Sequence, residues 1–108
     1  GIDSRAGVAA MMGDDALYLR LLKMFRDREA DFPERFQAVR ARGARAAALR
    51  LAHDLKSVSG SLAMPAVHRA AADLELACAN GAGDEDVQAL TREVSHHLSP
   101  VIAQLKAL

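Results

Sequence analysis

Apolar residues recur three or four positions apart along almost the whole chain, and this spacing restricts the chain to helices. Such spacing places apolar side chains on one face of an α-helix, whereas a half-buried strand would need strict alternation. Composition agrees, because 51% of the residues are hydrophobic but only 4% are aromatic. Ala and Leu, which favour helices, therefore dominate the apolar fraction. The longest run comprises Val87, Leu90, Val94, Leu98, Val101, Leu105 and Leu108.

Capping residues and helix breakers divide the first half of the chain into segments. We expect Asp3 to cap a short helix that ends at Gly13, and Asp14 to cap a second helix. The apolar pattern is interrupted near residues 31–32, where Pro33 suits the first turn of a new segment. Gly43 is expected to end that segment.

The second half has two more breaks. A long helix is expected over 44–64, and Pro65 suits the first turn of the next helix. A turn over 80–83 precedes a last helix that Asp84 would cap. Pro100 should kink or split this helix.

Short connections imply antiparallel neighbours, so the sequence predicts an all-α fold. We expect an antiparallel up-and-down four-helix bundle with a short extra N-terminal helix, forming one domain over residues 1–108. Its predicted core includes Leu21, Phe25, Leu51, Leu55, Val58, Leu74, Leu90 and Val94.

Charge and cysteine content exclude several classes of protein. Lys plus Arg is 14 and Asp plus Glu is 14, so the basic excess typical of nucleic-acid binders is missing. Cys78 is the single cysteine and cannot form an internal disulfide. No apolar run approaches the roughly 20 residues of a membrane span. We expect a cytoplasmic domain, and the initial Gly1 suggests a module excised or processed from a longer protein.

The stretch from residue 48 to 62 has a second face that its own core does not explain. At about 100° per residue, His53 lies opposite the apolar stripe of this helix. Lys56, Ser57 and Gly60 fall within about 60° of His53. We therefore expect His53 to face solvent in the middle of a long helix. The predicted apolar stripe consists of Leu51, Leu55, Val58 and Leu62.

Gly60 and Leu49 are unusual on a helix face that is exposed to solvent. Glycine costs about 1 kcal/mol relative to Ala inside a helix, and the expected packing within the domain does not require it. We interpret Gly60 as giving a partner steric access to the backbone beside His53. Leu49, one turn before His53, is a candidate docking contact. Met64 is expected to border the same face and to contact the partner too.

An imidazole, an ammonium group and an uncovered backbone together suit a phosphoryl group. A lone surface histidine is ordinarily only solvated, so this interpretation depends on the combination. Neutral histidine can act as a nucleophile toward phosphorus. Lys56 would offset part of the charge that phosphorylation adds to His53.

Basic residues also precede His53. Five arginines and no acid occur between residues 35 and 50. They either form a solvated helix face or steer an acidic partner surface towards His53, which Arg45 and Arg50 flank. His68, His96 and His97 have no cysteine nearby, so we predict no metal site and no cofactor of the chain's own.

The order of residues from Ala52 to Leu62 resembles the signature of histidine-containing phosphotransfer (HPt) domains. That signature reads His, any residue, Leu, Lys, Gly, a second Gly three positions further on, an apolar residue and often another Gly. Ser57 stands where the family most often has its first Gly, and Ala63 where a later Gly is common. Residues 1–25 and the pair Leu74-Glu75 are also similar. The matching positions are Ala52, His53, Leu55, Lys56, Gly60 and Leu62.

The resemblance implies a phosphorelay intermediate and not an enzyme. His53 would accept a phosphoryl group from an aspartate of a response-regulator receiver domain and pass it to an aspartate of another. Such domains have no ATP-binding or autokinase activity, and the receiver supplies Mg²⁺. The domain would be a monomer, either free-standing or the module of a hybrid sensor histidine kinase that is membrane-bound. It would contact neither nucleic acid nor membrane. The implied docking contacts are Leu49, Arg50, Ser57, Met64 and Arg45.

Two alternatives remain open at this point. The phosphoacceptor and dimerisation domain of a sensor histidine kinase has His, an acid, Leu or Ile, Lys or Arg, a polar residue and Pro. Residues 53–57 fit that pattern, but Val58 stands where Pro is expected. That domain is a helical hairpin, which must dimerise to form a bundle. The second alternative is a helical interaction module without a role in signalling.

Overall fold

Six helices make up the part of the chain that the computed structural model describes, which is residues 2–10 and 14–108. No strand occurs in these two ranges, so the predicted all-α class is confirmed. The same residues contain no helix that is both long and apolar enough to cross a bilayer. The helices are α1 (Ser4–Ala10), α2 (Asp15–Glu29), α3 (Phe32–Ala41), α4 (Arg45–Ser61), α5 (Pro65–Ala79) and α6 (Asp84–Leu105).

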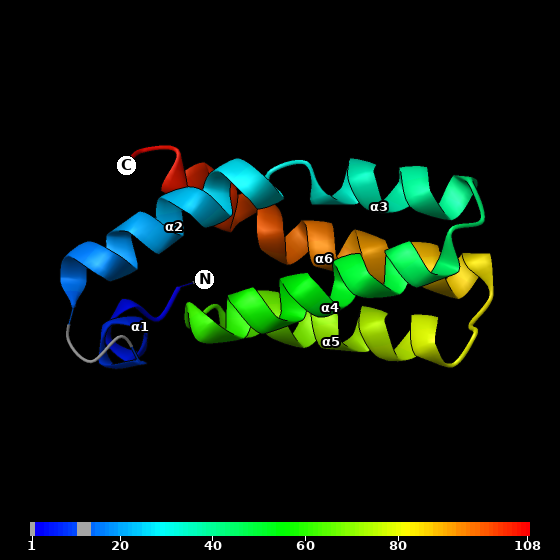
Figure 1. Cartoon of the computed structure of the whole chain (residues 1–108), viewed down its shortest axis with the longest axis horizontal. Coiled ribbons are helices and arrows are strands. Elements are labelled where there is room, and N and C mark those ends of the chain that lie inside the picture. The colour runs from blue at the N-terminus through cyan, green and yellow to red at the C-terminus, as the bar shows by residue number, and fades with distance from the viewer. Residues whose placement is uncertain (1, 11–13) are drawn as a thin grey trace.

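The helices form an elongated bundle measuring 41 × 23 × 19 Å. Helices α2 and α3 follow one another along the long axis and act as one interrupted column (Figure 1). Helices α4, α5 and α6 form the other three columns, with α5 packed against both α4 and α6. The short α1 lies across the end of the bundle where α2 begins (Figure 1). This arrangement confirms the predicted helical bundle with an extra N-terminal helix.

One arginine holds the junction between α2 and α3. The Nη2 group of Arg35 donates hydrogen bonds to the carbonyl of Arg28 at 2.8 Å and to Glu29 Oε2 at 3.0 Å. Its Nε donates to Asp31 Oδ1 at 2.9 Å. Pro33 lies in the first turn of α3, where its missing N–H costs nothing. The expected break at residues 31–32 is thereby explained.

Three helices end in the same hydrogen-bond motif. At the ends of α3 and α5, Gly43 and Gly81 have φ values of +73° and +70°. The next residue donates its N–H five positions back, as in a Schellman motif. Helix α4 ends identically, but there Ala63 has a φ of +59°. The N–H of the following residue, Met64, donates to the Ser59 carbonyl at 2.9 Å.

This motif corrects the expected position of Met64. The sequence suggested that the helix continues to residue 64 and that Met64 borders the face of His53. Because the chain reverses at Ala63, Met64 instead turns inward and is 0% exposed. Apolar burial of the residue after the left-handed one is typical of this motif. A partner therefore cannot contact Met64.

The buried face of α4 is rotated from its predicted position. Leu55 and Leu62 are buried as expected, but Leu51 and Val58 lie half-buried at the rim of the core. Small residues are buried instead. Small side chains allow two helices to approach closely, and α4 and α5 are the most extensively packed pair of helices in the described residues. The small buried residues are Ala48, Ala52 and Ser59 on α4, and Ala70 and Ala71 on α5.

The remaining core predictions hold in part. Phe25, Leu74 and Val94 are buried, whereas Leu21 and Leu90 are half-buried against the core. The spacing of apolar residues identifies the apolar face of each helix but not which side of that face meets a neighbouring helix. The largest fully buried side chains include Phe32, Phe36, Leu55, Leu62, Met64 and Leu74.

Tyr18 connects the N-terminal helices to the end of α4. Its hydroxyl donates to the carbonyl of Leu62 at 2.9 Å, which satisfies a carbonyl that the helix end leaves free. A Cβ on Gly7 of α1 would come 2.3 Å from the Tyr18 ring, so the ring occupies that space. The N–H of Asp3 also donates to the Ala63 carbonyl at 2.7 Å. Helix α1 thus covers the turn between α4 and α5.

The predicted caps are correct at the first two helices and displaced at the last. Asp3 and Asp14 accept hydrogen bonds from N–H groups three residues further on. Asp84 is the first residue of α6, and Gly83 is its N-cap. Pro100 does not split α6, which continues to Leu105. The expected end of the first helix at Gly13 lies outside the described residues.

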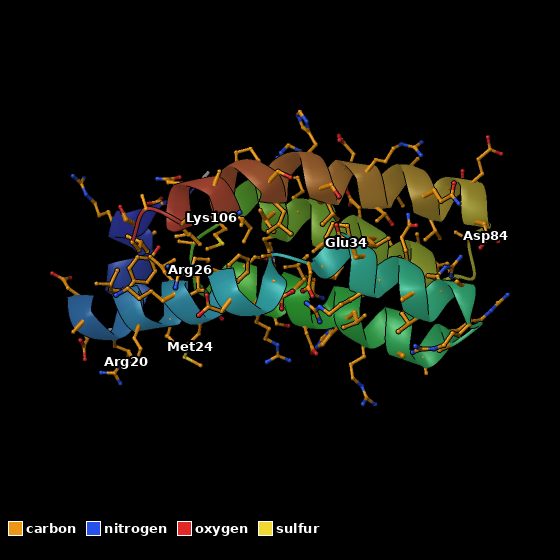
Figure 2. The ribbon with its side chains drawn as sticks, turned by 90° about the horizontal axis from the view of Figure 1, so that it is seen from above. Arg20, Met24, Arg26, Glu34, Asp84 and Lys106 are labelled. Carbon is orange, nitrogen blue, oxygen red and sulfur yellow. The ribbon has the colours of Figure 1, made fainter. Side chains whose placement is uncertain are left out.

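The end of α6 is capped by a side chain from α2. Arg26 Nη1 donates to the carbonyls of Leu105 and Leu108 at 3.3 and 3.4 Å. Figure 2 shows Arg26 directed into the space between α2 and the last turn of α6. A cation at a helix C-terminus also interacts favourably with the helix dipole. The contact joins residues 79 positions apart, so it helps to close the bundle.

We predict that Ala63→Gly stabilises the protein. A positive φ places Cβ too close to the backbone in every residue except glycine, so the substitution should raise the free energy of unfolding by about 1 kcal/mol. Urea denaturation followed by circular dichroism would measure it. Gly81→Ala is the matched control, because it introduces the same strain and should lower stability. Equal or reduced stability of Ala63→Gly would contradict this account.

A second prediction concerns Glu29, whose side chain is only 5% exposed. Burial raises the pKa of Glu29, and Arg35 and Arg28 offset only part of this effect. In the unfolded chain the pKa of a glutamate side chain is about 4.3. Since the folded pKa is higher, ionisation penalises the folded state as the pH rises above that value. The free energy of unfolding of Glu29→Gln, minus that of wild type, should therefore increase between about pH 4 and 7. Urea titrations at each pH would measure this difference in the free energy of unfolding. A difference that stays constant or falls with pH would contradict the prediction.

Candidate functional site

His53 lies near the middle of α4 with 56% of its side chain exposed. This exposure was predicted from the helical pattern and is confirmed. The ring is held from one side only, because His53 Nδ1 and Glu75 Oε2 form a short hydrogen bond. Glu75 belongs to α5. The site is therefore built by two helices, although the sequence predicted it on one.

Glu75 also binds the lysine of the site. Lys56 Nζ lies 2.5 Å from Glu75 Oε1, so one carboxylate bridges the imidazole and the ammonium group. The Lys56 hydrogen bond lowers the pKa of Glu75, and the bond from His53 adds to this effect, while burial opposes it. Glu75 is consequently an anion at neutral pH and can only accept hydrogen bonds.

This arrangement fixes how the neutral His53 ring carries its proton. Since a carboxylate only accepts, the shared hydrogen belongs to Nδ1. Nε2 then carries the lone pair of the imidazole. Because Nδ1 contacts Glu75, Nε2 is the ring nitrogen that this hydrogen bond leaves free. The arrangement therefore gives His53 a nucleophilic nitrogen on a side chain that is largely exposed.

A packing reason explains Gly60. A Cβ at this position would lie 2.8 Å from Nδ1 and 3.0 Å from Cε1 of His68 on α5. The expectation that packing within the domain does not require this glycine is therefore wrong. The His68 ring occupies the space, and its Nδ1 donates to the Lys56 carbonyl at 2.7 Å. His68 was interpreted from the sequence only as a surface or boundary residue.

The sequence contains a signal for both residues that the prediction missed. An antiparallel helix pair places side by side the residues that are equally distant from its turn. His53 and Glu75 are each eleven residues from Met64, and Gly60 and His68 are each four residues from it. Pairing positions across the expected turn would have brought both residues of α5 to this face.

Two grooves flank the His53 face. The first lies between α4 and α5, and Leu49, Arg50 and the 61% exposed Leu76 line it. The second lies between α2 and α4 on the opposite side and includes Ser57. The side chains lining the second groove include Leu21, Met24, Arg28, Asp54, Val58 and Ser61.

The predicted partner contacts are thus distributed over both sides of His53. Leu49 and Arg50 belong to the first groove and Ser57 to the second. Arg45 begins α4 and is exposed, but it lines neither groove. Met64 is buried. The structure therefore leaves four of the five expected contacts accessible to a partner.

Glu75 should affect stability with a pH dependence opposite to that of Glu29. Because its folded pKa is lowered, Glu75 stabilises the fold above its unfolded pKa of about 4.3, and this contribution is lost as the pH falls through the folded value. Glu75→Gln should be less stable than wild type near pH 7, by at most about 1 kcal/mol for such an ion pair. The difference should vanish under strongly acidic conditions. Thermal unfolding at several pH values would test this, and a pH-independent difference would contradict it.

A family model described as "Hpt domain" matches residues 20–108, which include α3 to α6 and most of α2. No curated protein and no solved structure matches the chain. The family consists of phosphotransfer domains of two-component signalling, which interact with receiver domains of response regulators. The matched region contains His53, Lys56, Gly60 and Glu75, and with most of the sequence covered, the chain belongs to the Hpt domain family.

Proposed function

We propose that His53 is the phosphoacceptor of this Hpt domain and exchanges a phosphoryl group with receiver-domain aspartates. The observation that supports this most strongly is the hydrogen bond between His53 Nδ1 and Glu75. It leaves Nε2 as an exposed nucleophile, while Lys56 lies on the same carboxylate. His68, the other histidine of this region, is half-buried and holds a backbone carbonyl.

The proposed step needs no proton transfer at the attacking nitrogen. The Nε2 lone pair of His53 attacks the phosphorus of a receiver aspartyl phosphate. A P–N bond forms, the P–O bond to the aspartate breaks, and the aspartate leaves as a carboxylate. The imidazole keeps its hydrogen on Nδ1 and gains positive character, which the Glu75 carboxylate stabilises. Transfer to a second receiver reverses these changes.

Lys56 has a separate role in this proposal. In the resting domain its ammonium group neutralises Glu75. Its side chain is 30% exposed, so the flexible end can turn towards a phosphoryl group on His53. Charge stabilisation and positioning account for most catalysis of phosphoryl transfer. We infer that the receiver supplies the rest, including Mg²⁺, and that this domain supplies neither a nucleotide site nor autokinase activity.

The direction of Nε2 also suggests how a receiver approaches. Because Nδ1 is bound to Glu75, we infer that the aspartate reaches Nε2 from the exposed side of α4. His53 lines the groove between α4 and α5, and the groove between α2 and α4 lies on the other flank. Leu21 and Met24 of the groove between α2 and α4 offer apolar contact there, and Met24 is 59% exposed. Figure 2 shows Met24 projecting outward from α2. Arg45 and Arg50 would attract the acidic site of a receiver.

The composition of the bundle supports this proposal over the sensor-kinase alternative. A helical hairpin domain needs a second chain to complete its bundle. Here one chain supplies every helix that encloses the described core. We therefore propose that the domain acts as a monomer, which sedimentation or light scattering would check.

The decisive prediction concerns His53 and Lys56. His53→Gln should remain folded, since substitutions at exposed positions usually cost within about 0.5 kcal/mol, and it should accept no phosphoryl group. Lys56→Ala keeps the nucleophile and loses one stabilising charge, so transfer should slow several-fold without vanishing. Incubation with ³²P-labelled receiver domains, followed by gel autoradiography, would measure both.

The control for this experiment is the set of other histidines. His96 is exposed on α6, so His96→Gln makes the same chemical change on another helix and should be labelled like wild type. If His53→Gln incorporates label at the wild-type rate, the proposal is wrong, because the phosphoryl group must then reside on another residue. Loss of label in His96→Gln would do the same.

A further inference from the structure

We propose that His68 is a positioning residue for the phosphoacceptor site, a role that rests on the function proposed for His53. His68 touches neither the reacting nitrogen nor the Lys56 ammonium group. It acts through the backbone of Lys56, whose carbonyl accepts a hydrogen bond from His68 Nδ1 at 2.7 Å. Gly60 makes this contact possible, because any larger residue there would occupy the position of the ring.

Both groups of the hydrogen bond between His68 and the Lys56 carbonyl are held in place. The imidazole is half-buried between α4 and α5. A backbone carbonyl can only accept, so the ring keeps a hydrogen on Nδ1 whether it is neutral or protonated. The Lys56 carbonyl also accepts a hydrogen bond from the Ser59 hydroxyl at 3.1 Å. This carbonyl is therefore held from two directions at the level where α4 meets α5.

The contact is placed where it can set the geometry of the site. His68 and Glu75 are seven residues apart on α5, which is about two helical turns, so they lie on the same face. Through that face α5 contacts Lys56 twice, at its backbone by His68 and at its ammonium group by Glu75. The hydrogen bond between His68 and the Lys56 carbonyl thus sets the position of Glu75 along the helix axis relative to His53.

The cost of Gly60 supports this inference. A glycine inside a helix loses about 1 kcal/mol relative to Ala, and α4 contains it near the phosphoacceptor. A hydrogen bond between helices could form elsewhere along this seam without a glycine. The lower helix propensity of Gly60 is explained if the His68 ring must lie next to Lys56, which binds the carboxylate of Glu75.

The experiment compares three substitutions in the whole domain. His68→Leu keeps an apolar side chain at the seam but removes the donor. His68→Asn keeps a side-chain N–H near the place of Nδ1. His96→Leu is the matched control, because it makes the same change at an exposed histidine of α6. Phosphoramidate, a small phosphoryl donor, reports the reactivity of His53 without receiver docking.

The first readout is the rate of phosphorylation, measured where each variant is fully folded. His68→Leu should slow it about fivefold, as expected for losing one net hydrogen bond. His68→Asn and His96→Leu should stay within about twofold of wild type. Equal rates for His68→Leu and wild type would overturn the proposal. So would equal slowing in the Leu and Asn variants, because the hydrogen bond would then not be the cause.

The second readout is spectroscopic and needs no phosphorylation. The ¹⁵N chemical shifts of the His53 ring report how its proton is shared between Nδ1 and Nε2. His68→Leu should move these shifts towards those of a free imidazole, and His68→Asn should not. A purely structural role would lower stability and leave the shifts unchanged. If wild type accepts no phosphoryl group, the proposed function fails, while the shifts still decide the role of His68.

Gly60→Ala provides an independent approach if His68→Leu does not fold. Its Cβ would displace the His68 ring from the Lys56 carbonyl, although alanine favours the helix. We expect the same slowing as in His68→Leu. The double variant Gly60→Ala/His68→Leu should be no slower than either single variant, since both remove one contact. Additive slowing, or a normal rate in Gly60→Ala, would overturn the proposal.

Discussion

The contacts that build the site cross the seam between α4 and α5, the most extensively packed pair of helices in the described part of the chain. Ala48, Ala52 and Ser59 on α4 and Ala70 and Ala71 on α5 are small and buried. Larger side chains along this seam would hold the helices apart. Because the seam is narrow, the residues at its solvent edge can make hydrogen bonds across it. The contacts of Glu75 and His68 with α4 follow from that distance.

The turn between α4 and α5 sets which residues meet along this seam. Ala63 adopts a left-handed conformation, and Met64 turns into the core behind it. This burial fixes the start of α5 and hence the register of the pair. A shift of one residue in α5 would rotate its face by about 100° and separate Glu75 from His53. The strain at Ala63 is therefore placed at the point that determines the alignment of the site.

Glu75 gives the site its resting electrostatics. Its carboxylate orients the imidazole of His53 and neutralises the ammonium group of Lys56. Glu29 shows the contrasting case of a buried carboxylate at the junction of α2 and α3, where burial outweighs its arginine partners. The two glutamates differ because Glu75 lies at the edge of its helix pair. Water there reduces the cost of the charge, while Lys56 binds it directly.

The two departures from the family signature have different consequences in the fold. Ser57 is exposed and lines the groove between α2 and α4, where its hydroxyl is available to a partner. Ala63 acts through the backbone, because its positive φ belongs to a motif that favours glycine. Ser57 is therefore placed to affect the docking of a partner, whereas Ala63 is placed to affect stability.

Local sequence patterns were enough to predict the helical class, most helix boundaries and the exposure of His53. These features depend on local periodicity, caps and prolines, which act within a few residues. Packing between helices sets which side of each apolar stripe is buried, and on α4 it buries Ala48, Ala52 and Ser59 while Leu51 and Val58 stay at the rim. It also decided that Met64 is buried and that Gly60 accommodates His68. The hydrogen bonds of Glu75 and His68 join residues 22 and 12 positions apart. Such contacts depend on the distance and register of two helices, which no helical pattern within one segment specifies.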